Sequence, residues 1–383
     1  MSKEKIGMYS DQIRGVSYKE SDIHDSLNDK SIILLRANNI FENEINFDNV
    51  VYVDKSRVTK KQYLQKGDIV VCASSGSKHL VGKAAQVDFD TEVTFGAFLK
   101  VVRPKNILAN YLGYYFLSNE YRRTISSISE GANINNIRNE HIDELLISIV
   151  DKDTQKKRSE ILDKVYGILK RKKQLLNEYD QLIKSRFVEM FMNKGYHKEI
   201  LKNIAVSKAE YGAASASVPH ELGRPRYVRI TDINDDGTLN DNVVCSNNLK
   251  DDINYKLSYG DFLFARMGAT VGKTYAFYEG NEIFAGYLIR YKLNLNKINP
   301  RYLFTYTKLE EYMSWVNNNQ SGAAQPGINA RKYDELTIPL APIELQNEFA
   351  LFVEQVDKLK FAVQKSLEET QRLFDALMQQ YFG

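Results

Sequence analysis

The sequence predicts an α+β protein with two tandem, mixed α/β domains and two long helices that separate them, arranged as a pseudo-twofold internal repeat. Two observations support this fold class: similar phrases recur in the two halves, and a long segment with heptad spacing follows each half. The expected boundaries are 1–150 for the first domain, 151–192 for the first helix, 193–342 for the second domain and 343–383 for the second helix.

The internal repeat is visible in pairs of residues at nearly constant spacing. Asp68 and Asp261 occupy the same place in a Gly-Asp phrase, at an offset of 193 residues (261 − 68). Gln155 and Gln346 correspond at an offset of 191 (346 − 155). A nearly constant offset over so long a stretch indicates a duplicated unit, and two similar modules on one chain suit a target that itself has two parts.

The first half contains short apolar runs and one longer helical pattern. Residues 31–36, 68–72 and 93–102 are apolar, rich in β-branched side chains and bounded by turn residues, which predicts buried strands. Residues 107–130 carry apolar side chains at helical spacing and predict a helix. The first domain is therefore expected to be mixed α/β with irregular loops, and residues 195–342 to copy it.

Each domain is followed by a segment that predicts one long helix. Between residues 152 and 191 the apolar positions alternate spacings of three and four, with one polar interruption. The expected seam consists of Ile161, Val165, Ile168, Lys172, Leu175, Tyr179 and Leu182. Residues 343–383 repeat the pattern in register, with Val363 at the place of Lys172. So long a helix needs a partner helix to cover its apolar stripe. We therefore expect an antiparallel pair in which each helix begins beside one domain and ends beside the other. The alternative is that each helix packs only on its own domain.

Composition and charge narrow the class of protein. The 383 residues include 43% hydrophobic side chains, as in ordinary globular proteins, and the net charge of +3 permits a nucleic-acid partner without demanding one. Cys72 and Cys245 are the only cysteines, too few for a disulfide framework or a cysteine metal cluster. The first residues lack the apolar run of a signal peptide, and no apolar stretch is long enough to span a bilayer, so we expect a cytoplasmic protein.

One glycine-bearing segment imitates a phosphate-binding loop. Gly268 and Gly272-Lys273-Thr274 are separated by three residues, whereas a P-loop needs four. The following residues, 275–278, predict a strand rather than the helix that a P-loop requires. We therefore interpret the segment as a loop whose glycines allow the backbone to approach a ligand closely.

A second segment, Asn299-Pro300-Arg301-Tyr302, imitates the Asn-Pro-x-Tyr element that holds a flipped adenine in amino-methyltransferases. That chemistry also needs a glycine-rich loop after an early strand to hold the methyl donor, and we find no such loop. Asn299 and Pro300 fit better as the N-cap and the first residue of a helix.

No catalytic or metal-binding constellation emerges from the sequence. The five histidines are scattered, with no pair at i, i+4 spacing. The acidic residues of 140–144 are expected on a solvated turn before a strand. The sequence therefore predicts no catalytic residue and no metal site.

The two halves share polar loop residues of the types that read base edges. Arg suits guanine, Asn or Gln suits adenine, Asp suits cytosine and Ser or Thr adapts, while Lys and Arg also hold phosphates. In the first half these candidate DNA-binding residues are Arg36, Asn38, Asn39, Ser74, Ser75, Ser77, Lys78, Lys83, Asn133, Asn135, Asn136 and Arg138. In the second half they are Arg229, Thr231, Asp232, Arg266, Thr270, Lys273, Gln320, Gln325, Asn329 and Arg331. The alternative for any one residue is that it only makes a turn, but corresponding loops in two units favour DNA recognition for the set.

Four phrases carry a resemblance to a known family. They are Gly260–Lys273, which runs from Gly-Asp-Phe-Leu to Gly-Lys, and the segments Leu34–Ile40, Ile338–Gln346 and Ser185–Phe191. Together they resemble the specificity subunit of Type I restriction–modification enzymes, and the resemblance covers essentially the whole chain.

The resemblance implies two target-recognition domains, each reading one half of a bipartite site in double-stranded DNA. It implies that the spacer helices dock two modification subunits, which use S-adenosylmethionine to methylate adenine at N6. It also implies that restriction subunits add translocation and cleavage driven by ATP and Mg. The present chain would then bind no cofactor and no membrane, would have no catalytic activity of its own, and would supply the DNA address.

The two halves also differ in a way that bears on the target. Ala73 stands in the first half where Arg266 stands in the second, and the loop after Ala73 is longer, which predicts an asymmetric DNA site. Two other classes stay open. One is a self-sufficient adenine methyltransferase that uses residues 299–302, and the other is a coiled-coil scaffold whose globular ends bind protein.

Overall fold

A computed structural model of the chain describes residues 2–76, 80–90, 92–131, 136–322 and 326–383. The chain divides into two compact units, one formed by residues 1–173 and 365–383 and the other by residues 174–364. The helices α4 (Lys152–Phe191) and α10 (Ile343–Phe382) each contribute residues to both units. Within the described ranges, no helix is long and apolar enough to cross a membrane.

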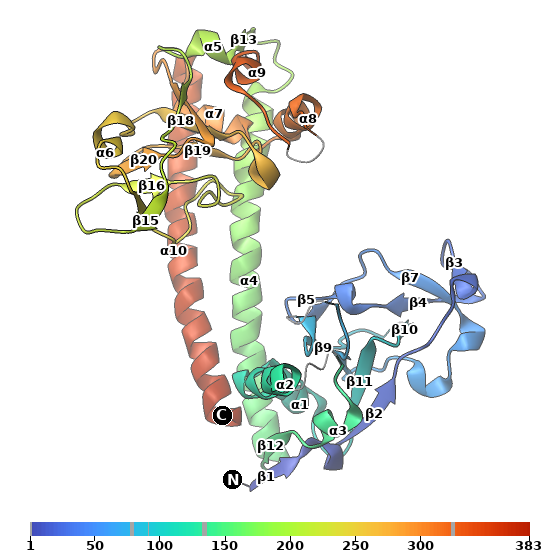
Figure 1. The fold of residues 1–383 in the computed structure, drawn as a ribbon. Helices are drawn as coiled ribbons and strands as arrows, with labels where there is room; N and C mark the ends of the chain where they lie inside the picture. The colour runs from blue at the N-terminus through green and yellow to red at the C-terminus, as the bar shows by residue number, and fades with distance from the viewer. Residues whose placement is uncertain (1, 77–79, 91, 132–135, 323–325) are drawn as a thin grey trace. The chain divides into compact units, whose positions relative to one another are not determined.

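The domain of the first unit is built around two four-stranded sheets (Figure 1). The first sheet is antiparallel and has the order β2 (Ser10–Arg14), β11 (Leu99–Pro104), β8 (Ile69–Cys72) and β9 (Ala84–Gln86). The second has the order β10 (Val93–Phe95), β4 (Ser31–Leu35), β7 (Val51–Asp54) and β3 (Ile23–His24), with β10 parallel to β4. Two short pairs complete the domain, β1 (Ser2–Lys5) with β12 (Leu146–Ile149) and β5 (Ile40–Phe41) with β6 (Glu44–Ile45).

The helices of this domain are shorter than the sequence pattern predicts. The expected helix over 107–130 is divided into α1 (Ala109–Leu117) and α2 (Asn119–Gly131), because Ser118 between them takes an extended conformation. The expected strand over 93–102 is likewise divided into β10 and β11 at residues 96–98. The acidic segment 140–144, expected on a turn, mostly lies in the one-turn helix α3 (Asn139–Asp143).

The domain of the second unit repeats the main antiparallel sheet and has two separate strand pairs in place of the second four-stranded sheet. Its main antiparallel sheet has the order β14 (Glu210–Tyr211), β21 (Leu288–Lys292), β18 (Asp261–Ala265) and β19 (Thr274–Ala276), which corresponds to β2, β11, β8 and β9. The parallel pair β16 (Arg226–Val228) and β20 (Glu282–Phe284) corresponds to β4 and β10, and β13 (Lys198–Ile200) with β22 (Thr337–Pro339) corresponds to β1 with β12. The remaining elements are β15 (Ser217–Pro219), β17 (Val244–Ser246), α5 (Leu201–Ile204), α6 (Asp251–Asn254), α7 (Pro300–Tyr306), α8 (Glu310–Asn319) and α9 (Ala330–Asp334).

Side-chain hydrogen bonds repeat along with the topology. The hydroxyl of Tyr111 donates to the carbonyl of Ser148 at 2.9 Å, and that of Tyr302 donates to the carbonyl of Pro339 at 2.6 Å. Two further matched pairs bond to backbone carbonyls in the same way: Tyr121 to Gly82 with Tyr312 to Gly272, and Gln155 to Val150 with Gln346 to Ala341. The predicted duplication is therefore confirmed down to individual bonds.

The repeated Gly-Asp phrase has a structural explanation. Gly67 and Gly260 adopt positive φ angles of 93° and 86°, which a side chain would strain. The aspartate that follows each glycine is buried and bonds an arginine of the neighbouring strand, at 2.7 Å for Asp68 with Arg103 and at 3.3 Å for Asp261 with Arg290. These residues fix the start of β8 and β18, and thereby the loops at the far ends of these strands.

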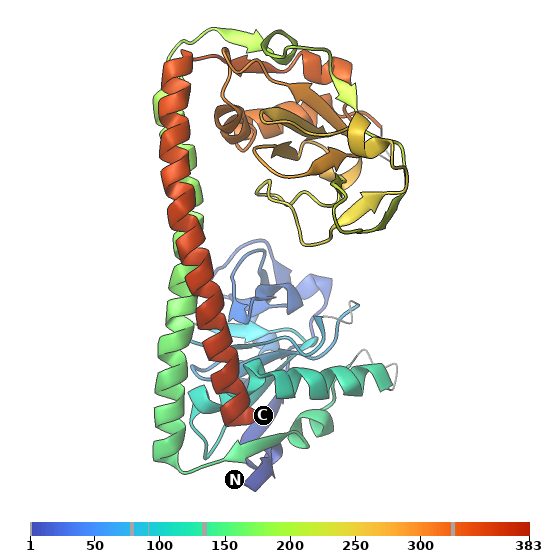
Figure 2. The same cartoon turned by 90° about the vertical axis from the view of Figure 1, so that its left-hand side faces the viewer.

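The two long helices pair antiparallel, as predicted (Figures 1 and 2). In the first unit, Tyr166 of α4 packs on Phe374 of α10 with ring centroids 5.7 Å apart. In the second unit, Asp180 of α4 accepts a hydrogen bond from Lys360 of α10 at 2.5 Å. Taken within each unit by itself, the two residue numbers of the pair sum to 540 (166 + 374 and 180 + 360).

Each long helix also ends on the domain of the other repeat. Phe191, at the end of α4, packs on Tyr302 of the second domain with ring centroids 4.8 Å apart. Phe382, at the end of α10, packs on Tyr111 of the first domain at 5.0 Å. The helices therefore do not pack only on their own domains, and that alternative is wrong.

The seam itself differs from the expected one. Ile161, Ile168 and Leu182 are exposed, whereas Leu162 and Leu169 are buried. The reason is that α4 packs on its own domain as well as on α10, and this contact rotates the buried stripe by one residue. Lys172 keeps its place between the helices, where its ammonium donates to Ser366 and Thr370 of α10 at 2.6–2.9 Å.

Candidate nucleic-acid interface

The loop after β4 and the loop after β16 are held by the same type of bond. The backbone N–H of Arg36 donates to the side-chain oxygen of Asn39 at 2.8 Å, and that of Arg229 donates to the carboxylate of Asp232 at 2.8 Å. Asn39 and Asp232 are fully buried. Each of these two side chains therefore holds its own loop in place, and base reading by Asn39 and Asp232 stays a prediction.

The arginines that precede these loops differ in their availability. Arg36 is exposed, and one of its terminal nitrogens donates to the carbonyl of Asn49 at 2.8 Å. Arg229 forms a two-bond pair with Asp232, at 3.0 and 2.8 Å, and this bonding raises the pKa of its guanidinium. Asn38 and Thr231, at the tips of the loops, are exposed.

The loop after β18 positions Arg266 beside aromatic rings. The Arg266 Nε donates to the carbonyl of Gly286 at 3.2 Å, and the guanidinium carbon lies 5.0 Å from the Tyr211 ring centroid and 5.7 Å from that of Tyr287. These contacts orient the guanidinium and restrict its rotation. Arg266 thus has the preorganised planar donor set that bidentate recognition of guanine requires.

The rest of this loop is partly engaged within the protein. Thr270 donates through its hydroxyl to the carbonyl of Met267 at 3.2 Å. Lys273 donates to the carbonyl of Ile233 at 3.3 Å and pairs with the exposed Asp235 at 2.7 Å. Lys273 is therefore already paired, and its charge is partly neutralised.

The P-loop resemblance is not accompanied by P-loop geometry. Gly268 and Gly272 both have positive φ angles, 72° and 85°. A short 3-10 turn begins at Gly268 and ends at Thr270, and the chain then enters the strand β19 rather than a helix. A Cβ at Gly272 would lie 2.8 Å from Val316, so this glycine serves the close packing of the loop on α8. The segment is a strand-to-strand loop without the helix N-terminus that binds phosphate.

In each domain, two of the three candidate loops lie together. In the first domain Ser74 forms a β-bridge with Asn136, and the N–H of Ile137 donates to the carbonyl of Ala73 at 2.7 Å. In the second domain the N–H of Ile328 donates to the carbonyl of Arg266 at 2.9 Å. The chain thus brings residues distant in sequence to one edge of each main sheet.

The remaining candidates fall into three groups. Asn329 caps α9 by accepting from the N–H of Lys332 at 3.0 Å, and Gln320 ends α8 and donates to Asn317 at 3.4 Å. Candidates that are exposed or half-buried in the loops are Ser74, Ser75, Lys83, Asn136, Arg138 and Arg331. Candidates that lie outside the described residues are Ser77, Lys78, Asn133, Asn135 and Gln325.

The Asn-Pro-Arg-Tyr segment is the start of a helix. The side chain of Asn299 accepts from the N–H of Arg301 at 2.9 Å, and Pro300 is the first residue of α7. Tyr302 is fully buried among aromatic side chains. A buried ring cannot stack on a flipped adenine, so this segment has the structural role predicted for it.

In the described ranges, no group of three or more His, Cys, Asp or Glu side chains is arranged to hold a metal ion.

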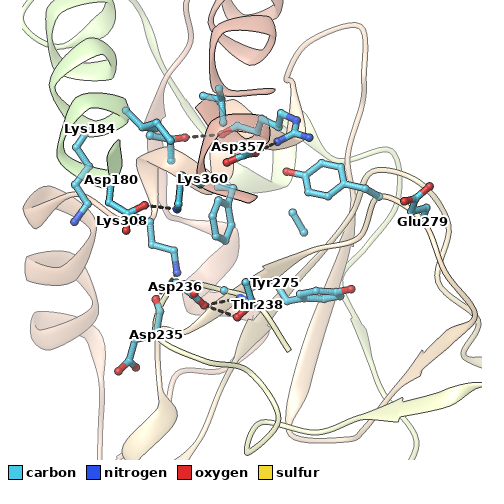
Figure 3. A pocket seen from close by; sticks show the side chains of 18 residues that line it. Asp180, Lys184, Asp235, Asp236, Thr238, Tyr275, Glu279, Lys308, Asp357 and Lys360 are labelled. Carbon is cyan, nitrogen blue, oxygen red and sulfur yellow. Dashed lines mark hydrogen bonds and ion pairs between the residues drawn. The ribbon is translucent and has the colours of Figure 1, made fainter. Parts of the chain in front are cut away.

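A cavity of about 590 Å³ lies in the second unit between its domain and the long helices (Figure 3). Four of the charged side chains that line it form two ion pairs, Asp180 with Lys360 and Arg301 with Asp357 at 2.6 Å. Lys308 also lines this cavity and donates to the carbonyl of Asp235 at 2.9 Å. The cavity is lined by α7, the two long helices, β19 and residues 235–238. None of the candidate DNA-binding residues that the structure describes lines it, and we assign no ligand to it.

Lys308 provides a pH-dependent prediction. Burial lowers its pKa to about 8, so below pH 8 the folded protein carries a poorly solvated ammonium that the unfolded chain solvates freely. The first repeat has Leu117 at this position (308 − 117 = 191). We expect Lys308→Leu to raise the melting temperature at pH 7, and its advantage over the parent to shrink as the pH rises from 7 to 9, where the parent loses this proton.

Differential scanning calorimetry of both proteins across that pH range measures the effect. Lys250→Leu, which removes an exposed lysine of the same unit, is the matched control and should give a difference that does not change with pH. A Lys308→Leu advantage that is equally large at pH 7 and pH 9 would contradict the prediction.

Three exposed side chains near these loops were missed by sequence reasoning: Tyr211, Tyr287 and Phe98. Each lies at a strand end beside a candidate loop, and the apolar character of aromatic residues predicts burial rather than exposure. Only the strand pairing reveals that Phe98 and Tyr287 occupy equivalent positions.

The fold and the loops define a class: a recognition protein with two copies of one module, joined by an antiparallel helix pair and carrying polar loops at equivalent sheet edges. A family model described as the Type I restriction modification DNA specificity domain matches residues 18–178 and 215–370. The chain belongs to this family. It is a specificity subunit of a Type I restriction–modification system, the component of such systems that recognises DNA, and the assignment predicted from the sequence is confirmed.

Two named relatives align with nearly the whole chain. The specificity subunit of the StySPI enzyme of Salmonella potsdam is 29% identical over 96% of this chain and 84% of its own length. That of the EcoKI enzyme of Escherichia coli K12 is 28% identical over 97% of this chain and 86% of its own length.

Among solved structures, the S subunit of a Type I system from M. genitalium is similar in fold. It has a TM-score of 0.55 at 16% identity and covers 100% of this chain and 96% of its own. A chain from a study of assembly and conformational transition in a Type I system has a TM-score of 0.54 at 15% identity, covering 100% and 97%.

Proposed function

We propose that this chain reads a bipartite, asymmetric DNA site, one half with each domain, and positions modification subunits that methylate adenine at N6. The observation that carries the proposal is a difference between the two domains at one equivalent position of the repeat. The loop after β18 presents Arg266, held by Gly286 and Tyr211, where the equivalent loop presents the buried Ala73. Because the two loops occupy equivalent positions but carry different side chains, the two domains offer different chemistry to the two halves of the site.

We propose the same role, contact with DNA, for the other candidate residues of these loops. They are the exposed or half-buried loop residues Arg36, Asn38, Ser74, Ser75, Lys83, Arg138, Arg229, Thr231, Thr270, Lys273 and Arg331. In this scheme the chain has no catalytic group of its own, and the methyl donor is bound by the partner subunits. The cytoplasm, where such partners and cellular DNA meet, is the compartment we propose for it.

Methylome sequencing tests the proposal. Cells that express this chain with its modification subunit should carry methylated adenines in a motif of two specified parts separated by unspecified bases, and the two parts should not be inverted copies of each other. Cells that lack only this chain provide the control. A methylated motif without a gap, or one with identical inverted halves, would refute a bipartite asymmetric reader.

We further propose where two modification subunits dock. Ile168 and Leu373, which lie at one level of the helix pair in the first unit, are 48% and 51% exposed. Leu182 and Leu359, at one level in the second unit, are 47% and 52% exposed. The repeat relates Ile168 to Leu359 and Leu182 to Leu373 (359 − 168 = 373 − 182 = 191), so the same apolar pair is presented twice and suits two copies of one partner.

Charge substitutions on these pairs should remove the partners one at a time. We expect Ile168→Asp with Leu373→Asp to leave a complex with one modification subunit, and the four substitutions together to leave none, because an aspartate cannot be buried unpaired in an apolar contact. Native mass spectrometry of the purified complexes measures the stoichiometry.

Leu222→Asp, which changes a fully exposed leucine outside the helices, is the control and should leave two modification subunits bound. Two bound subunits in the fourfold variant would show that docking uses another surface.

The alternative of a protein-binding scaffold differs in one measurable property. A DNA reader that contacts phosphates loses affinity steeply as salt is added, since counterions are released on binding. Fluorescence anisotropy of a duplex that carries the methylome motif, titrated between low and physiological salt, should show that loss. A scaffold that binds only protein would show no salt-dependent DNA affinity.

A further inference from the structure

An exposed aromatic side chain stands at the same place in both domains. Phe98, directly before β11, is 69% exposed, and Tyr287, directly before β21, is 54% exposed. The carbonyl of Phe98 accepts from the N–H of Ala73 at 2.9 Å, and the carbonyl of Tyr287 accepts from the N–H of Arg266 at 3.0 Å. The repeat therefore places both rings beside the loop position at which the two domains differ.

Both rings lie among the candidate reading loops. The N–H of Ser74 also donates to the carbonyl of Phe98, at 3.1 Å, and Ser74 forms the β-bridge to Asn136. In the second domain the N–H of Arg266 donates to the carbonyl of Tyr287, and the next residue, Met267, forms a β-bridge to Gly327. A bulky apolar ring kept in water at this edge gains nothing for the fold, but it is placed to meet whatever the loops bind.

The next strand supplies one more position to each cluster. Arg14 pairs with Lys100 in the register of β2 and β11, and Tyr211 pairs with Ile289 in the register of β14 and β21. Arg14 of the first domain therefore stands where Tyr211 stands in the second. The first cluster exposes an arginine and a phenyl ring, whereas the second exposes two phenol rings around Arg266.

We propose that Phe98 contacts the methyl group of a thymine in one half-site, and that Tyr287 positions Arg266 to read a guanine in the other. The inference rests on the proposed function and assigns residues that the loop chemistry alone did not. The Phe98 ring offers no hydrogen-bonding group, and Ala73 beside it is buried, so the apolar C5-methyl of thymine is the base feature that this ring fits. Tyr287 offers its ring face to the guanidinium, which stacking keeps in one plane.

Base analogues test the thymine contact. Duplexes that carry the methylome motif are prepared with each thymine of the first half-site replaced in turn by uracil, which lacks only the methyl group. The parent complex should lose about fourfold in affinity at one such position, the effect of one buried methyl group, and Phe98→Ala should bind both duplexes alike. If Phe98→Ala still distinguishes thymine from uracil at that position, or the parent distinguishes them nowhere, the assignment of Phe98 is wrong.

A second analogue tests the positioning role of Tyr287. Replacing a guanine of the other half-site by 7-deazaguanine removes the N7 acceptor and should weaken parent binding by about tenfold. Tyr287→Ala should lose most of this discrimination, and Tyr287→Phe, which keeps the ring, should retain it. A purely structural role for Tyr287 predicts instead that both variants keep the discrimination, which would overturn this part of the proposal.

The two levels of the proposal fail in different ways. If the parent complex shows no preference for the motif duplex over an unrelated duplex, the proposed function itself fails. If the parent prefers the motif and the variants keep every base discrimination, only the assignment of Phe98 and Tyr287 fails. Both side chains are exposed, so the melting temperatures of the variants should match that of the parent and exclude misfolding as the cause of any loss.

Discussion

Arg266→Ala should strongly reduce methylation of the chain's target while leaving the complex with its modification subunits intact. The guanidinium is aligned by the carbonyl of Gly286 and by the rings of Tyr211 and Tyr287, so its loss removes a preorganised pair of donors. A good bidentate contact to guanine is worth about 1–3 kcal/mol, or about 5- to 150-fold in affinity for the site. Methylome sequencing at limiting expression, together with binding to the motif duplex, measures both consequences.

Two comparisons sharpen the Arg266 experiment. Arg266→Lys should lose much of the discrimination although the charge remains, because an ammonium is a point charge without the planar fork. Arg171→Ala, which removes an exposed arginine from α4, should leave the methylome unchanged. Full methylation by Arg266→Ala would mean that Arg266 does not read the target.

Phe187→Ala should be the most destabilising single truncation in the second unit. The Phe187 ring is fully buried and lies 4.8 Å from Tyr302, 5.0 Å from Phe191 and 5.4 Å from Phe349, so it ties α4, α7 and α10 together. Removing a buried phenylalanine costs about 3–5 kcal/mol through the lost burial and the cavity left behind. In urea, the transition of this unit should move to a clearly lower midpoint.

The adjacent residue provides the control for this truncation. Val188 is 46% exposed on the same turn of α4, and Val188→Ala should change the free energy of unfolding by less than about 0.5 kcal/mol. If the two truncations shift the midpoint equally, the aromatic cluster is not what joins the helices to the domain.

Much of the architecture was predictable because it is repeated and periodic. The duplication is visible in matched residues such as Asp68 and Asp261. Each of these aspartates follows a glycine at the start of a strand and pairs with an arginine of the neighbouring strand. The helix start at Asn299 and Pro300 follows from local chemistry, since an amide cap and a fixed φ act without distant partners. Sequence patterns that depend only on neighbouring residues, or that occur twice in the chain, therefore predict the folded structure correctly.

The errors arise where distant contacts decide. The heptad pattern gives a wide apolar stripe on α4 but does not tell which edge meets the domain, and Ile168 is exposed while Leu169 is buried for that reason. Asn39 and Asp232 have the chemistry of base readers, and the sequence pattern did not show that each also holds its own loop through a hydrogen bond. Phe98 was overlooked because composition cannot distinguish an aromatic residue of the core from one at a strand end.

The matched hydrogen bonds of the two domains end on main-chain carbonyls, as those of Tyr111, Tyr302, Gln155 and Gln346 do. Every residue type supplies that acceptor, so mutations at the accepting positions leave the bonds in place. The two copies of the module can therefore differ in side chain at the accepting positions, as Ser148 and Pro339 do, while the same hydrogen bond holds each domain together.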